Sequence, residues 1–121
     1  MQSFFIVLTR PSEKFTGNLN VQFENPYRLH GDWEMAVTSL SYSGTFPLFI
    51  LCDLVGYSHV NNCKLKYLDF FDNVCRNSSP RYVKVIKKRF QSINVDIHQS
   101  LHDETISSTS EVICVLHIRK A

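Results

Sequence analysis

The sequence predicts an all-β fold, an antiparallel β-sandwich of about eight strands. Apolar residues recur mainly with a period of two, which is the period of side chains along a strand. Turn-forming residues interrupt these runs at intervals of roughly 8 to 15 residues. A βαβ arrangement would need amphipathic helices of about ten residues or more between the strands, and no segment has that pattern.

Size and composition indicate one ordinary globular domain. The 121 residues suit a single β-sandwich domain covering residues 1–121. With 44% hydrophobic and 20% charged residues, global disorder is unexpected. The net charge of +2 does not by itself require a nucleic-acid partner. No apolar run approaches the ~20 residues of a membrane span, and the N-terminus lacks the pattern of a signal peptide, so we expect no membrane association and no secretion.

The first half of the chain holds four expected strands. Residues 4–9 form a short apolar run, and residues 18–23 alternate between apolar and amide side chains until Pro26, which we expect to end the strand. Residues 33–42 form the longest extended segment, after a turn at Gly31 and Asp32. Residues 48–55 form a fourth, nearly continuous apolar run. Such a run is typical of a buried strand.

The second half holds four more expected strands, separated by longer polar segments. Residues 56–62 are expected to form a hairpin loop. Strands are expected at residues 64–71, 82–86, 93–98 and 112–118, and polar connections at residues 73–80 and 99–110. The three loops are the regions that we expect to carry contacts with other molecules.

Alternation along these segments selects a set of core residues. Trp33 is the only tryptophan and begins the longest strand, which suits a core anchor. The residues expected at the centre of the core are Trp33, Met35, Val37, Ile93, Val95 and Ile97. Further core residues are expected at Phe5, Val7, Phe23, Ile50, Val115 and Leu116.

A basic stretch is the main candidate for binding. Lys84, Lys87, Lys88 and Arg89 lie within six positions, and such a cluster can neutralise phosphate groups. The structural alternative is a solvated edge strand on which lysines prevent pairing with another chain, which is a common arrangement. One function that the sequence leaves open is therefore nucleic-acid binding by a small β-domain.

A metal site has weaker support. His98 and His102 are four residues apart, next to Asp103 and Glu104. On a helix this spacing would place two imidazoles on one face, but the segment leaves a strand and enters a polar loop. Solvated loop histidines are therefore the preferred interpretation, and we expect no metal.

Catalytic motifs are also missing from the sequence. It contains no G-x-S-x-G elbow, no S-x-x-K motif and no glycine-rich phosphate loop. Cys52 and Cys114 lie inside apolar runs, where a thiol acts as a small hydrophobic group, and the four cysteines show no close pair. We therefore expect free thiols, no enzyme activity and no cofactor.

The segment that contains Trp33 resembles a viral protein family. Residues 29–42 (LHGDWEMAVTSLSY) resemble an L-x-G-x-W-E-hydrophobic-A-L-x-x-hydrophobic-x-Y signature, with Val37 in place of its second leucine. It is similar to that of structural proteins encoded by Polinton/Maverick elements and the related adintoviruses. Further segments on both sides of it resemble motifs of the family, in the family's order and over most of the chain. They are residues 4–8 (FFIVL), 18–23 (NLNVQF), 50–55 (ILCDLV), 80–85 (PRYVKV), 93–97 (INVDI) and 116–119 (LHIR).

This resemblance implies a single jelly roll that serves as a minor, penton-like capsid protein of the virion. It further implies self-association, with a pentamer as one form, and contact with a major capsid protein. A cement protein on the capsid and a domesticated copy in an animal genome fit the same resemblance. The nucleic-acid-binding domain stays as the alternative.

Overall fold

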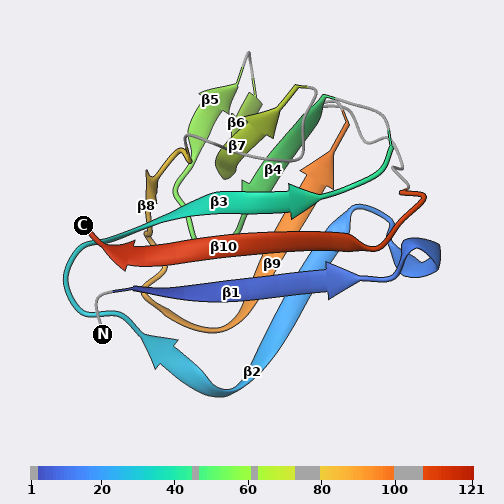
Figure 1. Cartoon of the computed structure of the whole chain (residues 1–121). Helices are drawn as coiled ribbons and strands as arrows, with labels where there is room; N and C mark the ends of the chain where they lie inside the picture. The colour runs from blue at the N-terminus through green and yellow to red at the C-terminus, as the bar shows by residue number, and fades with distance from the viewer. Residues whose placement is uncertain (1–2, 45–46, 61–62, 73–79, 100–107) are drawn as a thin grey trace.

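Two four-stranded antiparallel sheets pack face to face and carry a small hairpin (Figure 1). The computed structural model describes residues 3–44, 47–60, 63–72, 80–99 and 108–121. We call the sheet of order β1-β10-β3-β8 the first sheet and that of order β2-β9-β4-β7 the second sheet. The elements are β1 (Ser3–Arg10), the 3-10 turn η1 (Ser12–Lys14), β2 (Asn18–Arg28), β3 (Trp33–Ser41), β4 (Leu48–Cys52), β5 (Ser58–Val60), β6 (Cys63–Leu65), β7 (Tyr67–Phe71), β8 (Val83–Lys84), β9 (Arg89–His98) and β10 (Val112–Lys120). The predicted antiparallel β-sandwich is confirmed.

The first and last halves of the chain pair in reverse order. Strand β1 pairs with β10, β2 with β9, β3 with β8, and β4 with β7, and all four pairs are antiparallel. Strands β5 and β6 pair with each other at the turning point of this arrangement. The chain is therefore a long hairpin folded back on itself, and successive pairs alternate between the two sheets.

The core lies between the sheets and is built from the inward face of each strand. Alternation along residues 93–98 of β9 and along β10 places every second residue inward, as the period of two predicts. The six residues that the sequence placed at the centre are all buried: Trp33, Met35, Val37, Ile93, Val95 and Ile97. Further buried residues include Leu8, Leu19, Leu40, Leu48, Ile50, Leu68, Leu116 and Ile118.

The predicted orientation of β1 is wrong. Ile6 and Leu8 are buried, whereas Phe5 and Val7 point outward and are 61% and 55% exposed. An uninterrupted apolar run carries no polar alternation that could select one face, and a shift of one residue exchanges the two faces. For the same geometric reason Val115 cannot accompany its neighbour Leu116 into the core, and it is only partly buried.

Strand β2 does not end before Pro26, as the sequence suggested. It continues to Arg28, with a shift in its register to β9 between Gln22 and Tyr27. Because β2 is an edge strand, a proline there does not remove a ladder hydrogen bond. The Gln91 side chain donates from Nε2 to the carbonyl oxygens of Phe23 and Glu24, at 3.1 and 3.0 Å. These bonds satisfy backbone groups that the bulge frees from the ladder.

Several other boundaries differ from expectation. The strand expected at residues 64–71 is divided into β6 and β7. The strand expected at residues 82–86 is reduced to β8, followed by an isolated bridge between Val85 and Val55. The predicted loop at residues 56–62 contains β5. Residues 73–79 and 100–107 of the predicted connections lie outside the described residues.

Candidate functional site

The predicted basic stretch divides between two places in the fold. Lys84 belongs to β8 and lies opposite Glu34 in the first sheet. Lys87 and Lys88 form the connection to β9, and Arg89 is the first residue of that strand, in the second sheet. The backbone N–H groups of Ile86 and Lys87 donate to the Leu54 carbonyl, at 2.8 and 3.1 Å, and so fix this connection against the sandwich.

Arg28 joins the second part of the stretch. It ends β2 and lies directly opposite Arg89 in the β2–β9 ladder. Like charges that face each other across a ladder destabilise the strand pair. Sequence reasoning missed Arg28 because its pairing depends on the bulge in β2, and no local pattern reveals that register.

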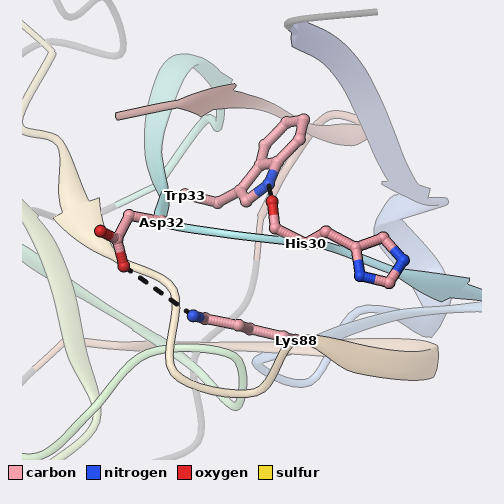
Figure 2. Close-up of polar contacts among 4 residues, drawn as sticks. All are labelled: His30, Asp32, Trp33 and Lys88. Carbon is pink, nitrogen blue, oxygen red and sulfur yellow. Dashed lines mark hydrogen bonds and ion pairs between the residues drawn. The ribbon is translucent and has the colours of Figure 1, made fainter.

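The segment between β2 and β3 lies against Lys88 (Figure 2). The backbone N–H of Leu29 donates to the Lys88 carbonyl at 2.8 Å, and Lys88 Nζ lies 3.9 Å from Asp32 Oδ1. The indole N–H of Trp33 donates to the His30 carbonyl at 2.8 Å. The turn at residues 29–32 is therefore fixed by the buried Trp33 ring and by its two contacts with Lys88.

The end of β10 completes this region. The backbone N–H of Ala121 donates to the Asp32 carbonyl at 2.9 Å. Gly31 has a φ of +87°, and Lys120 Nζ lies 3.6 Å from the position that a Cβ would occupy there. A side chain at residue 31 would be strained by this φ, so glycine suits the turn, and Lys120 lies at ordinary contact distance from it. We call Arg28, Lys87, Lys88, Arg89 and Lys120 together the basic end.

Positive charge at the basic end is only partly neutralised. Lys88 is the one member that forms an ion pair within the described part of the chain. Arg28, Lys87, Arg89 and Lys120 are exposed, and their charges have no acidic partner among those residues. Two exposed guanidinium groups beside exposed ammonium groups form a surface suited to phosphate or sulfate groups.

Two other cations have internal roles. Arg81 donates from Nη1 to the Leu68 carbonyl at 2.7 Å, and its guanidinium lies 4.7 Å from the centre of the Tyr67 ring. Arg119 lies 3.4 Å from the centre of the Tyr82 ring and 3.5 Å from Glu34. These contacts hold both side chains against the protein, so neither belongs to the basic end.

An aromatic cluster lies behind the basic end. Tyr27, next to Arg28, stacks in parallel on Phe4 at 5.3 Å and on Phe90 at 5.5 Å between ring centres. Phe23 meets the Tyr27 ring edge-on at 4.8 Å. Because the Tyr27 ring is engaged within the protein, it supports the strand ends rather than offering a free stacking surface to a nucleobase.

The outer face of the first sheet carries a second chain of contacts. Phe5 stacks on the His117 ring, with 4.4 Å between ring centres. His117 Nδ1 lies 2.8 Å from the Tyr82 hydroxyl, and these two groups share a hydrogen bond. This row connects the edge strand β1 through β10 to the segment before β8, and it leaves Phe5 and Val7 largely exposed.

The predicted interface loops are only partly described. In residues 56–60, Tyr57 is 61% exposed, and Lys64 Nζ and Lys66 Nζ lie 5.2 and 5.3 Å from the centre of its ring. In residues 108–110, Ser108 is buried, and its Oγ accepts from the Ser43 N–H at 3.1 Å. This Ser108 bond ties the start of β10 to the end of β3.

Of the four candidate metal-binding residues, only His98 belongs to the described part of the chain. His98 ends β9, while His102, Asp103 and Glu104 lie outside the described residues. Among the residues that are described, no three His, Cys, Asp or Glu side chains gather in a way that could hold a metal ion. The same residues include no helix of the length and apolar character that crossing a membrane requires.

The described thiols are free and fall into two kinds. Cys52 and Cys114 are buried, and burial raises the pKa of each thiol to about 12. Their proximity adds to the pKa of Cys114. Cys63 is free and exposed. Because the thiolate is the reactive form, the two buried thiols are inert near neutral pH and pack as small apolar groups.

A scan against protein-family models finds no match to this chain, and a search of curated protein sequences finds no significant match either.

Proposed function

We propose that this protein is a structural subunit of a virus-like capsid, a single jelly roll in a minor, penton-like role. It acts by associating with further copies of itself and by contacting other capsid proteins, including a major capsid protein, within the virion. The resemblance of residues 29–42 to the Polinton and adintovirus signature supports the capsid setting. The fold and the surface support a role in assembly.

The strand order supports the jelly-roll assignment. A jelly roll has eight strands in two sheets, connected as two Greek keys. Apart from the β5–β6 hairpin, eight strands of this chain form the orders β1-β10-β3-β8 and β2-β9-β4-β7. Two packed sheets of this kind form a rigid body whose edges and loops are free for contacts.

Exposed apolar side chains on the first sheet carry the proposal of assembly. Phe5 and Val7 are 61% and 55% exposed, and they lie side by side on the outer face of β1. Adjacent to them on β10, Val115 lies opposite Val7 and is itself only partly buried. Neighbouring apolar groups that face outward from a sheet are typical of a contact surface.

Light scattering over a series of protein concentrations tests this function. We expect the average mass to rise above the 14.0 kDa of one chain as concentration increases. A mass of one chain at every concentration, both alone and with a major capsid protein present, would reject the proposal. A closed ring would indicate heterologous contacts, which a penton-like role requires.

Nucleic-acid binding at the basic end is the second candidate function. The opposition of Arg28 and Arg89 favours it, because this repulsion is relieved when a phosphate lies between two guanidinium groups. Lys87 and Lys120 add further exposed positive charge. Since the neighbouring Tyr27 ring is engaged in the protein, we expect binding to phosphates with little dependence on base sequence.

An electrophoretic shift with duplex DNA tests this second function. The Arg28→Ala/Arg89→Ala variant should bind at least roughly tenfold more weakly at low salt. The matched control, Lys14→Ala/Lys64→Ala, removes the same charge from exposed positions elsewhere and should bind nearly as the unchanged protein does. Equal weakening by both variants would show a general charge effect and no site at the basic end.

A further inference from the structure

Each sheet of this sandwich has two edge strands, and three of the four edges are protected against pairing. An unprotected edge offers free N–H and C=O groups to another strand. Strand β2 has a bulge and contains Pro26, and β8 has only two residues, one of which is the exposed Lys84. Both features are common means of blocking an edge.

Strand β7 is protected by side chains. Arg81 donates to the Leu68 carbonyl at 2.7 Å, and Asp69 Oδ1 accepts from the Phe70 N–H at 2.7 Å. These two side chains occupy backbone groups of β7 and place charge along it.

Strand β1 has none of the features that protect the other three edge strands. It has eight residues, its register with β10 is continuous, and Ser3 to Thr9 includes no charge and no proline. Within the described part of the chain, no side chain bonds to its backbone. The second sheet approaches β1 through aromatic side chains, as in the stacking of Phe4 on Tyr27. A long, regular and apolar edge of this kind favours the addition of another strand.

The sequence of β1 is complementary to itself when two copies run antiparallel. With Ile6 opposite Ile6 of a second copy, Phe5 meets Val7 on the outer face, and Phe4 meets Leu8 on the inner face. Ser3 then lies opposite Thr9, so that hydroxyl faces hydroxyl. Aromatic residues beside β-branched residues, and Ser beside Thr, are favourable pairs across strands.

We propose that β1 is the contact through which two copies of this chain associate. The two β1 strands pair antiparallel about Ile6 and join the two first sheets into one continuous sheet. The absence of charge from Ser3 to Thr9 suits a second copy, because identical charged strands would repel each other at this register. The inference rests on the proposed self-association and specifies its contact. The pairing is isologous, so a ring would need a second, heterologous contact elsewhere.

Sedimentation of three proteins tests this contact: the unchanged chain, Val7→Lys and Ile86→Lys. Val7→Lys should raise the dissociation constant of self-association by roughly tenfold or more, because the two-fold axis places the change at both ends of the contact. Ile86 is 57% exposed and lies in the β8–β9 connection, so Ile86→Lys is a matched control that should leave the constant within about twofold. Because Val7 points outward, far-UV circular dichroism should show that both variants are folded.

A disulfide test checks the register. Phe5→Cys and Val7→Cys chains, each also carrying Cys63→Ser and Cys75→Ser, are mixed and oxidised with oxidised glutathione. The mixed dimer, in which a Phe5→Cys chain is joined to a Val7→Cys chain, should predominate over both dimers of identical chains. The reason is that residue 5 faces residue 7 across the axis.

The outcomes separate this inference from the proposed function. If the unchanged chain associates and Val7→Lys associates equally well, or if the mixed disulfide does not predominate, the contact at β1 is rejected while self-association stands. If the unchanged chain is monomeric at every concentration and with a capsid partner, both are rejected.

Discussion

Arg28 faces Arg89 directly across the β2–β9 ladder, and neither has an acidic partner in the described part of the chain. We predict that Arg28→Glu stabilises the protein and weakens its binding to polyanions. The repulsion becomes an attraction, so the free energy of unfolding should rise by about 0.5 kcal/mol in urea titrations. Retention on a heparin column should fall. A less stable variant, or unchanged retention, would show that this pair is not an anion-binding element.

Trp33 anchors the turn that positions Lys88, through its hydrogen bond to the His30 carbonyl. Trp33→Phe keeps an aromatic ring but removes the indole N–H and part of the buried volume. We expect a loss of about 1–3 kcal/mol in the free energy of unfolding, measured by urea titration. Leu51→Ala is a useful comparison, because Leu51 is partly buried and lies in β4 of the second sheet, whereas Trp33 belongs to the first sheet. A loss below about 0.5 kcal/mol for Trp33→Phe would mean that the turn does not depend on this bond.

Asp53 joins the end of β4 to β9 by two hydrogen bonds with one residue. Its carboxylate accepts from the Asn94 N–H at 3.1 Å, and its own N–H donates to the Asn94 carbonyl at 3.2 Å. Asp53→Ala should lower the free energy of unfolding by about 1–3 kcal/mol, because the Asn94 N–H loses its acceptor. Asp53→Asn keeps an acceptor and should cost less than half as much. Equal losses in chemical denaturation would indicate that charge matters here and the bond does not.

The buried thiols predict a loss of stability in alkali. Burial raises the pKa of Cys52 and Cys114 from 9.0 in the unfolded chain to about 12 in the folded one. Above pH 9 the unfolded state therefore releases protons that the folded state retains, and stability falls as pH rises toward 12. The thermal midpoint of Cys114→Ala should decrease less steeply with pH over this range than that of the unchanged protein. An identical slope in both would contradict the assignment, and Cys63→Ala serves as the exposed control.

Thiol labelling tests the same burial at a single pH. At about pH 8, a thiol reagent should modify the exposed Cys63 quickly, whereas Cys52 and Cys114 should react only after unfolding. A Cys75→Ser background restricts the comparison to these three thiols. Rapid modification of Cys52 or Cys114 in the folded protein would show that the core opens on the timescale of labelling.

Alternation in the sequence predicted the sandwich and its centre because a half-buried strand places every second residue in the core. This worked along β9, where Ile93 and Val95 alternate with polar neighbours. It failed on β1, because Phe5 and Val7 are as apolar as the buried Ile6 and Leu8. Only the position of β1 within its sheet decides which face is covered.

The basic end could be predicted only in part, for a similar reason. Lys87, Lys88 and Arg89 are adjacent in sequence, so composition alone identifies them. Arg28 comes to them through pairing between strands that are distant in the sequence, in a register set by a bulge. No local signal carries that information, and the Pro26 rule pointed to an earlier end of the strand.

Native mass spectrometry of the unchanged chain measures its self-association without any labelling or substitution. We expect a species of twice 14.0 kDa whose share grows with concentration, together with larger closed assemblies where a second contact forms. A spectrum with the 14.0 kDa chain alone at every concentration, and no complex on mixing with a major capsid protein, would contradict the proposed self-association.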